Sequence, residues 1–223
     1  MVVPTSPAVG RFPPVLVTGF DPFGGGRVNP SWLAVQGLHG RQIGGHRVVG
    51  AQLPTVFGES LAELRSLLTH LRPALVICLG QAGGRAALSL ERVAINVNDA
   101  RIPDNAGKQP IDTPVIAGGP DAYFTNLPIK AMLAALLDAG INAEVSQTAG
   151  TYVCNHVFYA LMHELAARPE LRLTRGGLIH VPWLPAQGQP SMRLDEVVRG
   201  VRLAIECALA TVTDIRKQAG ALN

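Results

Sequence analysis

The chain has 223 residues, of which 48% are hydrophobic and 16% charged, which suits one folded domain rather than a disordered chain. Its formal net charge is only +3, and the 19 lysine and arginine residues are scattered. Because nucleic-acid binding needs clustered positive charge, nucleic acid is not an expected partner.

Strand-like and helix-like segments alternate along the chain, judged by apolar periodicity and by Gly and Pro boundaries. In chain order we expect a strand over 14–18, a helix starting at 29–31 and running to 38, a strand over 46–53, a helix over 57–71, a strand over 74–79, a strand or hairpin arm over 88–98, a helix over 126–139, a strand over 143–147, a helix over 155–167, a strand over 177–181 and a helix over 194–213.

This alternation predicts an α/β fold. Repeated strand–helix units build a mostly parallel, twisted sheet with helices on both faces, which makes a three-layer α/β/α sandwich. The segment 80–125 is too long for a simple connection, and long loops in compact domains are often functional.

Three cysteines, Cys78, Cys154 and Cys207, are widely spaced. Their odd number argues against a disulfide framework and favours a reducing compartment. Residues 1–14 lack the apolar core of a signal peptide, and no apolar run reaches the ~18 residues of a membrane span. We therefore expect a soluble, cytoplasmic protein without membrane contact.

The loops after the strands carry most of the candidate chemistry. In open α/β sheets, ligands bind outside the carboxyl ends of the strands. The segments 19–26, 80–85 and 148–154 each follow a predicted strand, and His180 ends another. One sheet edge is therefore expected to gather two Phe, a Gln, a Cys and a His. Cys with His can form a nucleophile and base pair.

Cys154 lies just before a predicted helix, where the helix N-terminus would stabilise a thiolate. Backbone N–H groups there could also stabilise an oxyanion. The competing interpretation is a small buried core residue, the usual role of a free cysteine. That interpretation fits Cys78, inside an apolar strand, and Cys207, inside a helix. It fits Cys154 less well, because a Gly-containing loop precedes it.

Three histidines compete as the base. His156 is two residues past Cys154 on the same helix, so their side chains point in different directions. His163 with Glu164 lacks the H-E-x-x-H spacing of a zinc peptidase, so no metal site is expected. His180 ends an apolar strand, where spacing alone favours a structural histidine bonded to backbone.

Glu91 is expected on one strand face with Val93, Ile95 and Val97. A carboxylate on an apolar face needs a partner. It could orient a catalytic histidine, as the third member of a triad does. It could equally be a strand-end residue bonded to an arginine, and the residues alone leave both interpretations open.

Several enzyme classes find no support in the sequence. The glycine-rich segments 24–26 and 83–84 fit neither the dinucleotide pattern nor the P-loop pattern, and no G-x-S-x-G elbow is present. A nucleotide-binding protein and a serine hydrolase of the elbow type are therefore not expected.

Five stretches resemble pyroglutamyl peptidase I, also called pyrrolidone-carboxylate peptidase: VTGFDPFGGGRVNP, LGQAGGR, ERVAINVNDARIPDNAGKQP, SQTAGTYVCNH and GGLIHVPWLP. They run in order from residue 17 to 185 and are far more specific than one short motif. The resemblance implies a cysteine peptidase that removes an N-terminal pyroglutamyl (5-oxoprolyl) residue from peptides. It places the family's catalytic Glu, Cys and His on Glu91, Cys154 and His180.

The resemblance also implies a substrate site. Phe20 and Phe23 would contact the substrate ring, Gln81 would contact the pyroglutamyl amide, and Arg101 would lie near the reacting carbonyl. Tyr152 stands where many members carry Phe, so the pocket wall gains one hydroxyl. The implied substrate-binding residues are Phe20, Phe23, Asn29, Gln81, Arg101, Tyr152 and Val153.

Family members are intracellular, need no cofactor and are commonly tetramers. The resemblance thus implies a cytoplasmic homotetramer that acts on small peptides without metal or cofactor. About ten residues precede the family's usual start, so we expect one domain over 1–223 with a poorly ordered extension at 1–12.

Two other functions remain possible from the residues alone. A phosphorylase-type transferase on a similar sheet would need anion-binding loops and would not need Cys154. A non-catalytic binding protein or redox sensor would use Cys154 without turnover. Hydrolysis of pyroglutamyl-aminomethylcoumarin would separate both from a peptidase.

Overall fold

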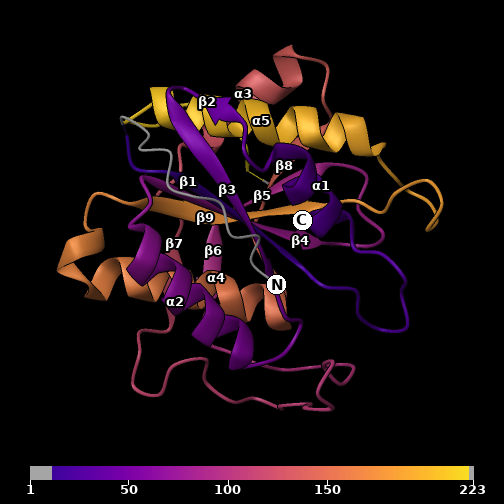
Figure 1. Ribbon diagram of the computed structural model, residues 1–223. Coiled ribbons are helices and arrows are strands. Elements are labelled where there is room, and N and C mark those ends of the chain that lie inside the picture. Colours follow the sequence, from indigo (N-terminus) through magenta and orange to yellow (C-terminus); the bar gives the residue numbers. More distant parts are fainter. Residues whose placement is uncertain (1–11, 221–223) are drawn as a thin grey trace.

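The computed structural model describes residues 12–220 (Figure 1). The strands are β1 (Val15–Phe20), β2 (Gln42–Ile43), β3 (His46–Leu53), β4 (Leu75–Gln81), β5 (Leu88–Glu91), β6 (Val93–Ile95), β7 (Ala122–Phe124), β8 (Ala143–Ser146) and β9 (Arg175–Val181). The helices are α1 (Pro30–Leu38), α2 (Glu59–Leu71), α3 (Ile129–Asp138), α4 (Val153–Ala167) and α5 (Leu194–Ala210), with the short 3₁₀ helix η1 (Pro169–Leu171).

Within the described residues, seven strands form one sheet in the order β2-β3-β1-β4-β9-β5-β8. The four central strands β3, β1, β4 and β9 are parallel to one another. At one edge, β2 is antiparallel to β3. At the other edge, β5 is antiparallel to β9, and β8 is parallel to β5. The sheet is therefore mostly parallel, as predicted.

Helices cover both faces of this sheet, which confirms the three-layer sandwich. Figure 1 shows α1, α3 and α5 on one side of the sheet and α2 and α4 on the other. Alternate residues of β4 face the two layers, as the period of a strand requires. Leu75, Ile77 and Leu79 belong to the core under α1, α3 and α5. Val76 and Cys78 belong to the core under α2 and α4.

The start of α1 closely matches its sequence signal. Asn29 caps the helix, because its Oδ1 accepts hydrogen bonds from the N–H and the hydroxyl of Ser31 at 3.1 and 2.8 Å. Pro30 occupies the first helical position. The hydroxyl of Ser31 accepts the N–H of Phe20 at 3.0 Å, so the cap also fixes the end of β1.

Tertiary hydrogen bonds shift some predicted boundaries. The helix predicted from residue 57 begins at Glu59, because the N–H of Phe57 donates to Asp104 and that of Gly58 donates to His156. The helix predicted from residue 126 begins at Ile129, since the side chain of Asn126 accepts the N–H of Gly176. The last helix ends at residue 210 rather than 213.

The strand or hairpin arm predicted over 88–98 is split between two sheets. The chain leaves β5 after Glu91 and enters β6, which pairs with β7 in a separate two-stranded sheet. Arg92 is the crossing point: its N–H donates to the carbonyl of Ser146, and its carbonyl accepts the N–H of Thr125. The prediction that Glu91 shares a strand face with Val93, Ile95 and Val97 is therefore wrong.

At the N-terminal side, the ring of Phe12 stacks on His46 with ring centroids 5.1 Å apart. Residues 1–11, the rest of the expected extension, lie outside the described part of the chain. Between residues 12 and 220, none of the helices has both the length and the apolar character to cross a membrane.

Candidate active site

Three parallel strands, β1, β4 and β9, bring candidate residues together at their carboxyl ends. Phe20 is the last residue of β1, Gln81 is the last residue of β4, and His180 is the penultimate residue of β9. β4 and β9 are neighbours, with Gly80 opposite His180 in the register. The prediction that carboxyl ends gather these side chains is confirmed for these strands.

Cys154 reaches this edge by another route. The prediction placed it after the carboxyl end of a strand parallel to the others, but β8 runs in the opposite direction. The cause is the pairing of β5, which is antiparallel to β9 and parallel to β8. The loop 147–152 then leads into α4, which packs on the sheet face beside β4 and β9. Cys154 is the second residue of α4, and its side chain belongs to the margin of the core below that helix.

The thiol of Cys154 and the imidazole of His180 meet over Gly80. A Cβ placed on Gly80 would lie 2.7 Å from Sγ of Cys154 and 3.0 Å from Nε2 of His180. Both atoms therefore approach the same point above Gly80. The absent side chain at position 80 leaves the space in which a nucleophile and a base come together.

The other ring nitrogen of His180 is held by Glu91. Nδ1 of His180 lies 2.8 Å from Oε1 of Glu91, and the two residues are 4% and 1% exposed. An ionised carboxylate only accepts hydrogen bonds, so Nδ1 carries the proton and Nε2 faces the thiol. Burial lowers the pKa of His180, but the Cys154 thiolate and the Glu91 carboxylate outweigh it and raise the pKa to about 9.

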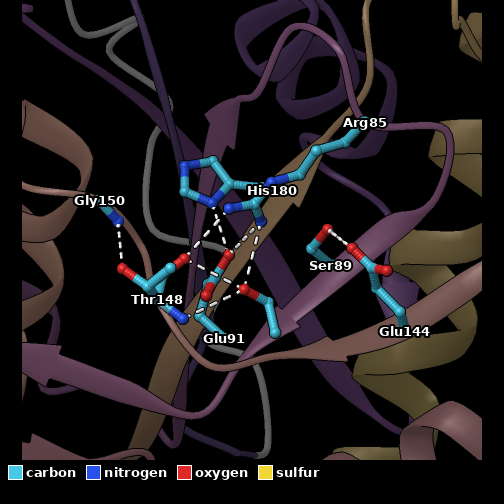
Figure 2. A network of polar contacts seen from close by, with 8 residues as sticks. Arg85, Ser89, Glu91, Glu144, Thr148, Gly150 and His180 are labelled. Carbon is cyan, nitrogen blue, oxygen red and sulfur yellow. Dashed lines mark hydrogen bonds and ion pairs between the residues drawn. The ribbon is translucent and has the colours of Figure 1, made fainter. Parts of the chain in front are cut away.

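Arg85 is the residue that the sequence analysis missed. Figure 2 shows its guanidinium above Glu91, where Nη1 lies 2.7 Å from the same Oε1 that binds His180. Nη2 donates to the carbonyl of Thr148 at 3.1 Å. Arg85 therefore ties the carboxylate to the loop that leads to Cys154. The signal was its place at the end of LGQAGGR, six residues before Glu91.

Glu91 thus satisfies both interpretations that the residues left open, since it binds a histidine and an arginine together. Two donors meet on one oxygen, and one of them is a fixed cation. The other oxygen, Oε2, is buried and accepts no hydrogen bond from the residues described. The buried charge is compensated through Oε1 alone.

The other two histidines are engaged elsewhere. Nδ1 of His156 lies 3.0 Å from Oδ1 of Asn98, and its Nε2 accepts the N–H of Gly58 at 3.2 Å. Both ring nitrogens are occupied, so His156 is not available as a base. His163 contacts the hydroxyl of Tyr123 at 3.0 Å. In the described residues, no cluster of three or more His, Cys, Asp or Glu side chains could hold a metal ion.

Aromatic side chains gather around Tyr152, two residues before Cys154. The ring of Tyr152 lies 5.9 Å from that of Phe23 and 5.4 Å, edge to face, from that of Phe57. The hydroxyl of Tyr152 donates to the carbonyl of Pro103 at 3.1 Å. The hydroxyl of Tyr152 therefore tethers the 99–110 loop.

The remaining predicted binding residues differ in exposure. Phe20 and Val153 are buried in the core under α2 and α4, and Arg101 is exposed on the 99–110 loop. Asn29 uses its Oδ1 to cap α1, and its Nδ2 donates to the carbonyl of Asp21 at 3.0 Å. Its contacts within the chain support the first loop.

The loop over 99–110 is bonded to the loop after β1. Asn105 donates through Nδ2 to the carbonyl of Pro22 at 2.9 Å and to Oδ1 of Asp21 at 3.2 Å. Buried Asp104 accepts the N–H of Phe57 at 2.8 Å. These anchors, which carried no recognisable sequence signal, hold two site-forming loops together.

Comparison with known proteins decides the family. A family model described as pyroglutamyl peptidase matches residues 14–211. The pyrrolidone-carboxylate peptidase 1 of Ralstonia nicotianae is 60% identical over 216 residues, covering 95% of this chain and 100% of that protein. The chain belongs to the pyroglutamyl peptidase family.

Solved structures of family members share the fold. The crystal structure of pyroglutamyl peptidase I from Bacillus amyloliquefaciens is 47% identical, with a TM-score of 0.90, and the match covers 93% of this chain and 100% of that one. A mutant pyrrolidone carboxyl peptidase from Pyrococcus furiosus is 42% identical, with a TM-score of 0.86 over 89% of this chain and 99% of that one.

Pyroglutamyl peptidases of this family are cysteine peptidases that remove N-terminal pyroglutamate, so the chain is a hydrolase. Membership sets aside the phosphorylase-type transferase and the non-catalytic sensor. The other cysteines lie in different surroundings: burial raises the pKa of Cys78 to about 12, and Cys207, on α5, contacts Thr211 directly after the end of that helix. Of the three cysteines, Cys154 is the one whose sulfur approaches, over Gly80, a histidine that binds a carboxylate.

Proposed function

We propose that this pyroglutamyl peptidase hydrolyses the bond after an N-terminal pyroglutamyl residue with Cys154 as nucleophile, His180 as acid and base, and Glu91 as orienting carboxylate. The observation that carries the proposal is the approach of Sγ and Nε2 to the same point over Gly80, with Nδ1 of the same ring on Glu91. A nucleophile, a base and an orienter in this order make up a triad.

The reaction is acyl transfer in two steps. Nε2 of His180 takes the proton of the Cys154 thiol, and the thiolate attacks the pyroglutamyl carbonyl carbon. The tetrahedral intermediate collapses when the imidazolium gives its proton to the leaving amine, which leaves a thioester on Cys154. Water, deprotonated by His180, then attacks the thioester and releases pyroglutamate and the thiol.

The negative oxygen of each intermediate needs donors. The first N–H groups of a helix have no partner within the helix, and Cys154 is the second residue of α4. We assign its N–H, together with the side chain of Arg101, to this oxyanion. The positive end of the α4 dipole acts in the same sense on the thiolate and on the oxyanion.

Substrate selection follows from the lactam ring. Phe23 and Tyr152 would form its apolar walls, with the buried side chains of Phe20 and Val153 behind them, and Asn29 would support the first loop. A pyroglutamyl ring carries one N–H and one C=O, whereas an N-terminal proline is a cation of similar size. Gln81 would pair with the lactam, and a prolyl ring would leave that group unpaired, at roughly 1–3 kcal/mol. Sites that read a polar substrate group can reject analogues lacking it by about 10⁴-fold.

We also propose a cytoplasmic homotetramer with one domain over 1–223 and no resident cofactor. Three free cysteines in the described chain support a reducing compartment. The tetramer rests on the resemblance to a family whose members are commonly tetramers. Cell fractionation tests the location, and light scattering coupled to gel filtration tests the assembly. A monomer at micromolar concentration would contradict the tetramer.

The activity test compares two matched fluorogenic substrates on purified protein. We expect pyroglutamyl-aminomethylcoumarin to be hydrolysed and prolyl-aminomethylcoumarin to be at least about 10³-fold poorer in kcat/KM. No hydrolysis of the first substrate would overturn the function. Values of kcat/KM within about tenfold of each other would overturn recognition of the lactam.

A further inference from the structure

The segment after β9 turns back over the end of β4. A Cβ placed on Gly83 would lie 2.3 Å from the indole of Trp183, so this ring is packed directly on the loop that follows β4. Leu184 and Gln187 close a turn: the N–H of Gln187 donates to the carbonyl of Leu184 at 2.8 Å. In return, the N–H of Leu184 donates to Oε1 of the Gln187 side chain at 2.9 Å.

Backbone groups fix the orientation of the Gln187 amide. A backbone N–H only donates, so the atom that meets Leu184 is the oxygen of Gln187. On the other side, Nε2 of Gln187 lies 3.4 Å from the carbonyl oxygen of Val28, which only accepts. The oxygen and the nitrogen of this side chain are therefore identified by two independent neighbours.

Gln187 passes this orientation to Gln81. Its Nε2 donates to Oε1 of Gln81 at 3.1 Å. Because the neighbour is a donor, Gln81 must turn its oxygen toward it, and its own NH₂ group is left at the opposite end of the amide. Gln81 stands one residue past Gly80, over which Cys154 and His180 meet.

We propose that Gln187 is a positioning residue for specificity, which holds Gln81 so that its NH₂ faces the substrate ring and its carbonyl is withheld. A donor in that place pairs with the C=O of a lactam and has no partner in a prolyl ring. The inference rests on the proposed function, because it takes the substrate ring to lie against Gln81. Gln187, which would not touch the substrate itself, would thus decide whether Gln81 presents a hydrogen-bond donor or an acceptor to the ring.

The decisive variant is Gln187→Glu. Glutamate keeps an oxygen for the N–H of Leu184 but replaces the donor toward Gln81 by an oxygen. Gln81 would then rotate its NH₂ to the glutamate and its carbonyl to the substrate. Gln187→Met removes both groups at similar length and leaves Gln81 free to take either orientation. Gln189→Glu makes the same chemical change on an exposed residue of the same loop and is the matched control.

The first readout is kinetic, with pyroglutamyl-aminomethylcoumarin. We expect KM to rise at least about tenfold in Gln187→Glu and less in Gln187→Met. The value of kcat should change little, because the hydrogen bond from Gln81 to the lactam is made in the ground state as well as in the transition state. Gln189→Glu should match the wild type. In a Gln81→Met background, Gln187→Glu should have no further effect, since its partner is gone.

The second readout needs no turnover. The neutral lactam 2-pyrrolidone should slow alkylation of Cys154 by iodoacetamide, followed at that residue by mass spectrometry. Gln187→Glu should weaken this protection about tenfold and leave the alkylation rate without lactam unchanged. This measurement separates the inference from the proposed function, which fails if the wild type does not cleave the peptide substrate.

Two results would overturn the inference. One is wild-type KM and wild-type lactam protection in Gln187→Glu. The other is a loss that persists at the same size in the Gln81→Met background, which would make Gln187 a purely structural residue. If Gln187→Glu does not fold, Gln187→Met carries the same test at smaller amplitude.

Discussion

Nδ1 of His180 lies 2.8 Å from Oε1 of Glu91, and both residues are almost fully buried although 89 positions separate them in the sequence. A buried imidazolium is unfavourable unless an anion compensates it. The carboxylate therefore does two things: it fixes the ring so that Nε2 faces the thiol, and it stabilises the charged ring.

Glu91→Gln should fold but turn over slowly. The amide oxygen can accept a hydrogen bond from Nδ1–H but stabilises the imidazolium hardly at all, so we expect kcat to fall by roughly 10²–10⁴. The carboxylate is one of the groups that raise the pKa of His180 to about 9, so its loss lowers that pKa. The alkaline limb of kcat/KM should then move to lower pH, which a pH–rate profile measures.

The matched control for this variant is Glu144→Gln. Glu144 lies on the neighbouring strand β8, where its Oε1 accepts the hydroxyl of Ser89 at 2.7 Å (Figure 2). The Glu144→Gln variant removes the same charge from a side chain that does not contact His180, so activity should be retained. Wild-type kinetics and an unmoved alkaline limb in Glu91→Gln would remove Glu91 from the triad.

Cys154→Ala should abolish turnover and leave the fold intact. Removal of the nucleophile should reduce kcat by about 10⁴-fold or more. Cys78→Ser and Cys207→Ser should keep most of the activity, because neither cysteine contacts His180. Circular dichroism checks the fold and the fluorogenic assay checks the rate. Substantial hydrolysis by a carefully purified Cys154→Ala protein would refute the mechanism.

Gly80→Ala should separate the thiol from the base. The added methyl would lie 2.7 Å from Sγ of Cys154, which is too close, so the thiol or the ring must move. A displacement of this size at reacting atoms costs on the order of 10²-fold in rate. We expect both kcat and the alkylation rate of Cys154 to fall.

Gly37→Ala is the control for that substitution. Gly37 lies in α1, and the atoms nearest to its added methyl would belong to the flexible side chain of Val198 on α5, the first of them at 3.0 Å. Its activity should stay close to that of the wild type. If Gly80→Ala also kept full activity, the proposed meeting point of thiol and imidazole would be incorrect.

The sequence predicted best those elements whose signals are local. The strand over 46–53 has the predicted bounds, and α1 starts where its Asn–Pro–Ser signal indicates. Pairing direction is not a local property. The residues of β5 and β8 carry no signal for the antiparallel pairing of β5 with β9. The prediction therefore placed Cys154 after a strand parallel to the others, and β8 in fact runs in the opposite direction.

The candidate site divides in the same way. Cysteine and histidine at loop and strand ends could be selected from position and chemistry. The partners of Glu91 could not be selected in this way. They depend on the passage of the chain from one sheet to the other at Arg92, and on the loop after β4, which places Arg85 against Glu91. Contacts such as Asn105 with Pro22, 83 residues apart, are set by the packing of whole loops.

The last prediction concerns acid stability and His156, whose buried ring connects α4 to the start of α2. Burial lowers its pKa to about 4, and the positive charges of Arg65 and Lys108 act in the same direction. The folded state therefore holds the neutral ring, whereas the unfolded chain binds a proton near pH 6.5. Stability from this group is full above pH 6.5 and is lost as the pH falls toward 4.

Between pH 7 and 4.5, this linkage should remove roughly 2–3 kcal/mol from the free energy of unfolding. His180 acts in the opposite direction by only about 1 kcal/mol, because its raised pKa keeps it protonated in the folded state while the unfolded ring gains its proton around pH 6.5. This contribution is the same in wild type and His156→Gln, so it cancels in their comparison. Urea unfolding at both pH values measures the loss. In His156→Gln, which cannot titrate, the decrease in the free energy of unfolding between the two pH values should be smaller by roughly 2–3 kcal/mol. The control His70→Gln, on the exposed side of α2, should show the same decrease as the wild type. An equal loss in wild type and His156→Gln would show that His156 does not control acid stability.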